Sequence, residues 1–200
     1  MMERKKVTEY VDIQAPREEV FDLVLNLKRR MQLSPLWGVA SIQEMDPNFP
    51  EMGSRYHVKV QSGEAREYDT VVTEYRPLSR LAYQLEVEQQ TRVTWTVQQV
   101  ASGTRVVYEE EFLVDEENQT AVTDTVREVI RNWLRNIKNY LELRDGRIKR
   151  LVRWLMDRYF LDLRKDQRQV ILTVLFMQLV GIISFIMAAI AMGIAGFVTG

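Results

Sequence analysis

Apolar and polar residues alternate at the start of the chain with the two-residue period of a β-strand. The alternation runs over residues 6–14, and Val7, Glu9, Val11 and Ile13 share one face. Ala15 and Pro16 end this strand, and proline followed by acidic residues is typical of a helix N-terminus. The pattern therefore predicts a helix with an apolar stripe and a second short helix over 28–33; the stripe comprises Val20, Phe21, Val24 and Leu27.

The middle of the chain has the pattern of antiparallel strands separated by turn residues. The predicted strands are 38–45, 54–61, 64–75, 80–90, 91–99 and 104–114. Helical spacing returns over 119–143, where one broad face is apolar and Gly146 is suited to a C-terminal cap. This order predicts an α+β fold in which a curved antiparallel sheet wraps around a long C-terminal helix.

Three segments resemble the START/Bet v 1-like superfamily, in its polyketide cyclase/dehydrase and lipid-transport group. They are Val11-Asp-Ile-Gln-Ala-Pro-Arg-Glu-Glu-Val-Phe-Asp-Leu-Val, Val72-Thr-Glu-Tyr-Arg-Pro-Leu-Ser-Arg-Leu-Ala-Tyr and Ser102-Gly-Thr-Arg-Val-Val-Tyr. The resemblance covers about residues 5–143 and implies a helix-grip fold with a cavity between the sheet and the long helix. It is specific for fold and carries no catalytic group.

Strand alternation gives a set of candidate lining residues for that cavity, because alternate side chains share a face. The strands contribute Leu81, Tyr83, Leu85, Val93, Trp95, Val97, Val106, Tyr108, Glu110 and Phe112, and the long helix contributes Val126, Ile130, Trp133 and Ile137. An apolar, aromatic lining with a few polar tips is typical of a hydrophobic small-molecule site. The alternative is that the same side chains fill a solid core.

The sequence offers few residues that could bind a metal ion or carry out catalysis. Cysteine is absent and His57 is the single histidine, which argues against metal centres and catalytic triads, so no cofactor, no metal and no catalytic residue is expected. Glu110 is the one charged residue on the predicted apolar face, where it either holds a polar ligand group or reaches solvent at the strand end.

The last part of the sequence predicts a membrane anchor in addition to the domain. Residues 170–198 form a 29-residue apolar run interrupted only by Thr173, Gln178 and Ser184. A helix of this length exceeds the roughly 30 Å hydrocarbon core of a bilayer. Ala189, Gly193 and Gly196 are small residues of the kind that let a partner helix approach closely.

A basic segment separates the apolar run from the domain. Residues 147–200 carry eight basic and three acidic residues, whereas residues 1–146 carry nineteen and twenty-five. The pattern over 147–168 predicts an amphipathic helix on the membrane surface, with a helix packed on the domain as the alternative. The predicted membrane-surface residues are Arg147, Lys149, Arg150, Arg153, Trp154, Arg158, Arg164, Lys165 and Arg168.

These patterns predict a domain over 1–146, a juxtamembrane helix over 147–168 and one transmembrane helix over 169–200. Because the basic residues all precede the span, the N-terminal domain is expected on the cytoplasmic side of a single-pass, tail-anchored protein. The acidic domain argues against nucleic-acid binding.

Three functional hypotheses follow. The first is a membrane-anchored binding or transfer module for a hydrophobic small molecule, such as a lipid, quinone, isoprenoid or pigment. The second is an accessory subunit of a membrane complex, with a vestigial pocket and a transmembrane partner. The third, an aromatase/cyclase-type enzyme, is the weakest, because the predicted cavity offers few acid–base groups.

Overall fold

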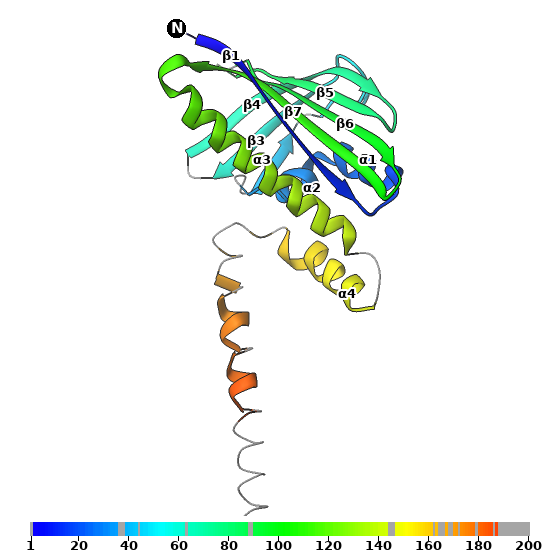
Figure 1. Cartoon of the computed structure of the whole chain (residues 1–200), viewed down its shortest axis with the longest axis vertical. Helices are drawn as coiled ribbons and strands as arrows, with labels where there is room; N and C mark the ends of the chain where they lie inside the picture. The colour runs from blue at the N-terminus through cyan, green and yellow to red at the C-terminus, as the bar shows by residue number, and fades with distance from the viewer. Residues whose placement is uncertain are drawn as a thin grey trace, which may run out of the picture. The chain divides into compact units, whose positions relative to one another are not determined.

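The computed structural model describes residues 2–35, 39–43, 45–62, 64–87, 90–143, 147–161, 163, 167, 170–171, 173–178, 180–185 and 187 (Figure 1). Its elements are β1 (Met2–Ile13), α1 (Arg17–Leu25), α2 (Leu27–Gln32), β2 (Val39–Gln43), β3 (Arg55–Ser62), β4 (Glu64–Arg76), β5 (Arg80–Leu85), β6 (Arg92–Val100), β7 (Gly103–Asp115), a short 3₁₀ helix η1 (Glu116–Asn118), α3 (Gln119–Glu142), α4 (Arg147–Leu155) and a π-helical segment η2 (Met156–Phe160). They divide into two compact units, Met1–Asp162 and Leu163–Gly200.

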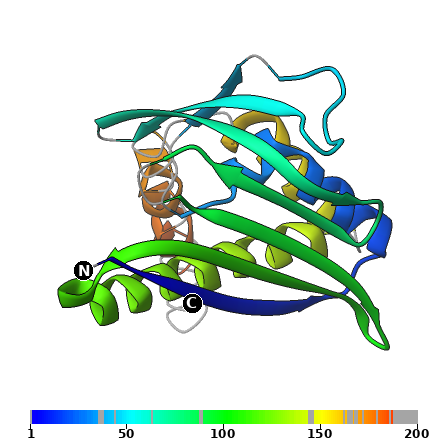
Figure 2. The same cartoon turned by 90° about the horizontal axis from the view of Figure 1, so that it is seen from above.

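The strands of the first unit form one antiparallel sheet in the order β1-β7-β6-β5-β4-β3-β2. Every neighbouring pair except β1 and β7 is consecutive in the chain, so β1 closes the meander by pairing with the last strand. Figure 2 shows the sheet curving around the long helix α3 and the pair α1 and α2. The predicted helix-grip arrangement of the domain is therefore confirmed.

One predicted strand is too long. The strand expected over 80–90 ends at Leu85, so Val87 lies outside it. The Leu85 amide donates to the Thr91 carbonyl oxygen at 2.9 Å and the Glu86 amide donates to the Asp69 carbonyl oxygen at 2.8 Å. These backbone hydrogen bonds turn the chain without glycine or proline, which is why the sequence pattern did not mark the end of the strand.

The junction of the first two helices fixes the position of α2. The Asn26 amide donates to the Asp22 carbonyl oxygen at 2.9 Å at the end of α1, and the Asn26 side chain accepts from the Arg29 amide at 3.0 Å. Asn26 therefore ends one helix and caps the next. Two side chains of α3 hold α2 from the other side: Trp133 Nε1 donates to the Arg30 carbonyl oxygen and Asn136 to the Leu33 carbonyl oxygen, each at 2.9 Å.

The segment after α3 packs on the domain. Arg153 Nη1 lies 2.9 Å from the Glu19 carboxylate, and its guanidinium covers the ring of Tyr140. The Tyr140 hydroxyl donates to Asp157 at 2.9 Å. Leu161, directly after η2, is 4% exposed and belongs to the core. Arg153 thus faces the domain, which corrects its place in the predicted membrane surface: a carboxylate and an aromatic ring there complement its guanidinium.

The remaining side chains of α4 are mostly exposed. Leu151 and Trp154 are 55% and 54% exposed, and Leu155 is also exposed. Lys149 and Arg150 on α4 and Arg158 on η2 are exposed as well. The side chain of Arg147 and the residues Arg164, Lys165 and Arg168 lie outside the described part of the structure. The predicted single helix over 147–168 is interrupted, because α4 gives way to a π-helical turn at Met156 that ends at Phe160.

The second unit is described only in part. Its described residues between 170 and 187 are helical, and Ala189, Gly193 and Gly196 lie beyond the last of them. Within the residues that the structure describes, no helix has both the length and the apolar character needed to cross a membrane.

Candidate functional site

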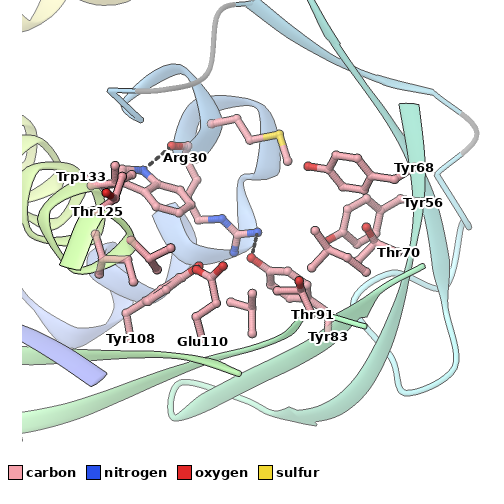
Figure 3. Close-up of a pocket in the computed structure, with 16 residues that line it drawn as sticks. Arg30, Tyr56, Tyr68, Thr70, Tyr83, Thr91, Tyr108, Glu110, Thr125 and Trp133 are labelled. Atoms are coloured by element: carbon pink, nitrogen blue, oxygen red, sulfur yellow. Dashed lines mark hydrogen bonds between the residues drawn. The ribbon is translucent and has the colours of Figure 1, made fainter. Parts of the chain in front are cut away.

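A cavity of about 150 Å³ lies between the sheet and the N-terminal half of α3, with α2 at one side (Figure 3). Seven elements and one loop contribute side chains to it. They are Arg30, Met31, Tyr56, Tyr68, Thr70, Tyr83, Leu85, Thr91, Val93, Tyr108, Glu110, Thr125, Val126, Val129, Ile130 and Trp133. The cavity is therefore largely apolar and aromatic, with hydroxyl groups, one carboxyl group and one guanidinium in its wall.

Eight of the fourteen predicted lining residues do line this cavity. They are Tyr83, Leu85, Val93, Tyr108, Glu110, Val126, Ile130 and Trp133. Five others are buried in the core and do not line it: Leu81, Trp95, Val97, Val106 and Ile137. Phe112 lines a neighbouring pocket instead. The inward-facing side chains thus serve two purposes. Some pack into a solid core between the sheet and the helices, and others surround the cavity.

A cluster of three aromatic rings separates the solid half from the cavity. Trp95 is completely buried, and its ring centroid lies 4.7 Å from that of Tyr108 and 5.3 Å from that of Trp133, both in edge-to-face contact. The rings of Tyr108 and Trp133 lie 5.6 Å apart. Because Tyr108 and Trp133 also line the cavity, this packing holds one wall of the site rigid.

Glu110 lies in the cavity wall beside Tyr108. The Tyr108 hydroxyl donates to the Glu110 carboxylate at 2.7 Å. Burial raises the pKa of Glu110 above its usual range, and the hydrogen bond from Tyr108 opposes that shift only in part. The protonated form is therefore favoured more than in water, and a neutral carboxyl group can donate as well as accept a hydrogen bond.

The tyrosines of the cavity are neutral phenols. Burial raises the pKa of Tyr56, Tyr68, Tyr83 and Tyr108, so none of them is a phenolate at physiological pH. Their hydroxyls give the apolar cavity a small number of fixed hydrogen-bonding groups. Such groups orient a ligand rather than activate it.

Arg30 is a charged cavity residue that the sequence reasoning missed. It lies on α2, is 1% exposed, and its guanidinium projects among the cavity residues. Nη1 donates to the Val24 carbonyl oxygen at 2.6 Å and Nη2 donates to the Tyr83 hydroxyl at 3.2 Å. Its spacing in the sequence could have identified it as inward-facing. Arg30 follows Val24 and Leu27 at three-residue intervals and so continues their apolar stripe.

Tyr56 and Tyr68 were also missed, because only the later strands were considered as lining. Tyr56 alternates with His57, which faces away from the cavity and lies 2.8 Å from Asp69. The alternation in this strand was visible in the sequence. The curvature of the sheet, which brings β3 and β4 over the cavity, was not visible there.

A second pocket of about 370 Å³ adjoins the first. Thr91, Glu110 and Val126 line both, and the rest of its wall comes from β1, the end of β7, the start of α3 and the residues between them. A ligand longer than the inner cavity could therefore extend past Glu110 into this outer pocket.

The site does not have the composition of a metal or nucleophilic centre. In the part of the chain that the structure describes, no three His, Cys, Asp or Glu side chains converge as a metal ion would require. The polar groups available are phenols, threonine hydroxyls, one carboxyl group and one guanidinium. This arrangement can enclose an apolar molecule and bind one polar group on it.

The fold and cavity together define a helix-grip domain with an internal hydrophobic site. A family described as "Polyketide cyclase / dehydrase and lipid transport" matches residues 4–142. The chain therefore belongs to the polyketide cyclase/dehydrase and lipid-transport family. No curated protein matches the chain.

Solved structures share the fold at low sequence identity. Protein CV1439 from Chromobacterium violaceum is 15% identical with a TM-score of 0.57, and the match covers 68% of this chain and 97% of that one. Protein MLL2253 from Mesorhizobium loti is 15% identical with a TM-score of 0.56, over 71% and 100% of the two chains. The di-domain ARO/CYC protein StfQ from the steffimycin biosynthetic pathway is 9% identical with a TM-score of 0.57, over 70% and 51%.

Proposed function

We propose that this protein binds a hydrophobic small molecule in the cavity beneath α3 and holds or transfers it at a membrane surface. The observation that carries the proposal is the cavity itself, in which aromatic and aliphatic side chains surround a small number of polar groups. A cavity of about 150 Å³ is the size of one that binds a benzene ring in a protein core. The family description, which includes lipid transport, supports the same ligand class.

The proposed membrane anchor rests on the sequence. Residues 170–198 remain apolar over a length that suits a transmembrane helix, and the basic residues all precede them. The exposed apolar side chains of α4, together with Lys149 and Arg150, are the composition of a helix that lies on anionic lipid. The domain would then be cytoplasmic.

Ligand binding is tested by extracting the full chain gently from membranes and identifying co-purified small molecules by mass spectrometry. Val129 lines the cavity, so Val129→Trp should fill it and abolish co-purification. Asn139→Trp adds the same bulk at an exposed position of α3 and should retain the ligand. Equal recovery from the three proteins, or no bound molecule in any of them, would contradict the proposal.

Anchoring is tested by fractionating cells that produce the full chain or a chain truncated after Arg168. The full chain should resist extraction by alkaline carbonate, and its N-terminal domain should be digested by protease added to the cytoplasmic side. The truncated chain should be released by salt or carbonate. Recovery of the full chain in the soluble fraction would overturn the anchor without affecting the proposed cavity.

A second candidate function is that of a subunit in a membrane complex. It is motivated by the small residues Ala189, Gly193 and Gly196 in the apolar run. Cross-linking in membranes should then give one product of fixed stoichiometry, which replacement of these residues with Leu should abolish. An unchanged pattern in the leucine variant would remove this candidate.

A further inference from the structure

Arg30 carries a buried positive charge that nothing in the described protein neutralises. Its side chain is 1% exposed, and none of the ion pairs among the described residues includes it. Removing a charged group from water is costly unless an opposite charge or a full set of hydrogen bonds replaces the water. Arginine keeps its charge in proteins because its pKa is too high for it to deprotonate.

The existing partners of Arg30 are all uncharged. Two hydrogen bonds go to the Val24 carbonyl oxygen and the Tyr83 hydroxyl, and the guanidinium lies 5.1 Å from the ring centroid of Tyr83 and 5.0 Å from that of Trp95. Nε is buried and has no hydrogen-bond partner. These contacts hold the guanidinium in place but leave a donor and the net charge unsatisfied.

Tyr83 adds a second unused donor at the same place. Its hydroxyl oxygen accepts from Arg30 Nη2 and from Trp95 Nε1, each at 3.2 Å. Both lone pairs are thereby occupied, so the hydroxyl hydrogen points elsewhere, and no hydrogen bond donated by Tyr83 is found among the described residues. Figure 3 shows the Tyr83 hydroxyl and the Arg30 guanidinium meeting inside the cavity.

Glu110 is the acidic residue of the cavity, and it does not neutralise Arg30. Its carboxylate accepts from Tyr108 rather than from the guanidinium. The raised pKa of Glu110 has burial as its main cause, which agrees with a carboxyl group that lacks a cationic partner.

We propose that the ligand is a hydrophobic monocarboxylic acid whose carboxylate accepts hydrogen bonds from Arg30 and Tyr83. This deepens the proposed function and rests on it. One guanidinium and one phenol match a singly charged head group, whereas a phosphate would bring more charge than these donors can balance. The apolar body lies against Val93, Val126 and Ile130, and a longer chain continues past Glu110 into the outer pocket.

The proposal predicts that the site distinguishes ligands by their charge rather than by their size. A neutral ligand of the same shape leaves the guanidinium unpaired, and sites with buried polar groups reject analogues that cannot satisfy them. The test uses naphthoate and naphthalenemethanol, which share a ring system and differ in the carboxylate. Binding is measured by isothermal titration calorimetry on the full chain in phosphatidylcholine nanodiscs.

The wild type should bind naphthoate at least about tenfold more tightly than the alcohol. Arg30→Met should remove this preference by weakening naphthoate binding alone. Arg29→Met is the matched control, because Arg29 lies on the same helix but pairs with Asp157 outside the cavity, and it should retain the preference. Tyr83→Phe, which keeps the ring and removes the hydroxyl, should reduce the preference in part.

Each failure has a separate meaning. If the wild type binds both compounds equally, the acid specificity is wrong and the hydrophobic site stands. If the wild type binds neither compound and nothing co-purifies with it, the proposed function fails as well. The comparison of two compounds on the wild type needs no variant, so misfolding of Arg30→Met would leave the test intact.

Discussion

At the scale of single residues, Glu110 makes stability depend on pH. Burial raises the pKa of this carboxyl group in the folded state, so the folded chain binds the proton more tightly than the unfolded chain. Its contribution is complete below the ordinary pKa of about 4.5 and is lost as the pH rises through the folded value. We expect Glu110→Gln to be more stable than the wild type at neutral pH, by about 1 kcal/mol or roughly 2–4 °C in Tm.

Glu109→Gln is the matched control. Glu109 lies next to Glu110 but faces the other side of the sheet, where it pairs with Lys6 at 2.7 Å. Loss of this surface ion pair should change stability by less than about 1 kcal/mol. Thermal unfolding of the three proteins across the acidic and neutral range measures both effects. A Glu110→Gln variant that is less stable than the wild type at neutral pH, but not at acidic pH, would show that the carboxylate is charged and well paired.

Gly103 illustrates a residue whose role is close packing of the backbone. Its φ is +138°, and a Cβ atom there would overlap the carbonyl oxygen of Ile13. Gly53, with φ +90°, has no atom within 4 Å of the corresponding position. Gly103→Ala should therefore cost about 2–4 kcal/mol, whereas Gly53→Ala should cost only the backbone strain of about 1–2 kcal/mol. Urea unfolding followed by tryptophan fluorescence compares them, and equal losses would show that contact with β1 is unimportant.

At the scale of elements, the segment after α3 stabilises the domain. Leu161 is buried in the core although it follows α4 and η2, whereas Leu151 on α4 is exposed. Leu161→Ala should lower the free energy of unfolding by about 2–4 kcal/mol, and Leu151→Ala should change it by less than about 0.5 kcal/mol. Chemical denaturation measures the difference. Similar small effects of both substitutions would show that the segment is not held to the domain in solution.

Local signals predicted most elements, and their failures have local causes. The long helix over 119–143 is predicted almost to the residue, since its apolar face repeats over six turns. The end of β5 at Leu85 and the π-helical turn at Met156 were not predictable, because backbone hydrogen bonds and tertiary contacts decide them. Asn26 shows the intermediate case: its type suits a helix cap, but its sequence position did not say which helix it would cap.

At the scale of the whole molecule, the exposed side of α4 and η2 predicts electrostatic binding to anionic membranes. Replacing Lys149, Arg150 and Arg158 with Gln should weaken binding of a chain truncated after Arg168 by about a hundredfold, at about 1 kcal/mol for each charge. The truncated chain keeps the whole first unit, which ends at Asp162. The measurement is sedimentation with phosphatidylserine vesicles at low salt.

The same number of charges removed elsewhere provides the control. Arg55, Arg76 and Arg92 are exposed basic residues of the sheet, and their replacement with Gln should have a small effect. High salt should abolish the difference between the two triple variants because it screens surface charge. Equal weakening by both sets would mean that net charge, and not the position of the charges on α4 and η2, determines vesicle binding.

The sequence by itself determined the class of fold, the order of the elements and the inward face of most strands. These follow from hydrophobic period and turn residues, which act between near neighbours in the chain. It also placed Tyr108, Glu110 and Trp133 on faces that line the cavity. The family resemblance added the expectation that a cavity exists.

Only the tertiary structure decided which inward-facing residues surround space and which fill it. Trp95 and Tyr83 occupy equivalent faces of adjacent strands, yet Trp95 is in the solid core and Tyr83 lines the cavity. Arg30 has the charge of a surface residue and a place inside the site, because Asn26 and Trp133 fix the position of α2. The two-residue period of a strand and the 3.6-residue period of a helix indicate which side of the element faces inward. How far apart the facing layers lie depends on sheet curvature and on contacts between distant parts of the chain.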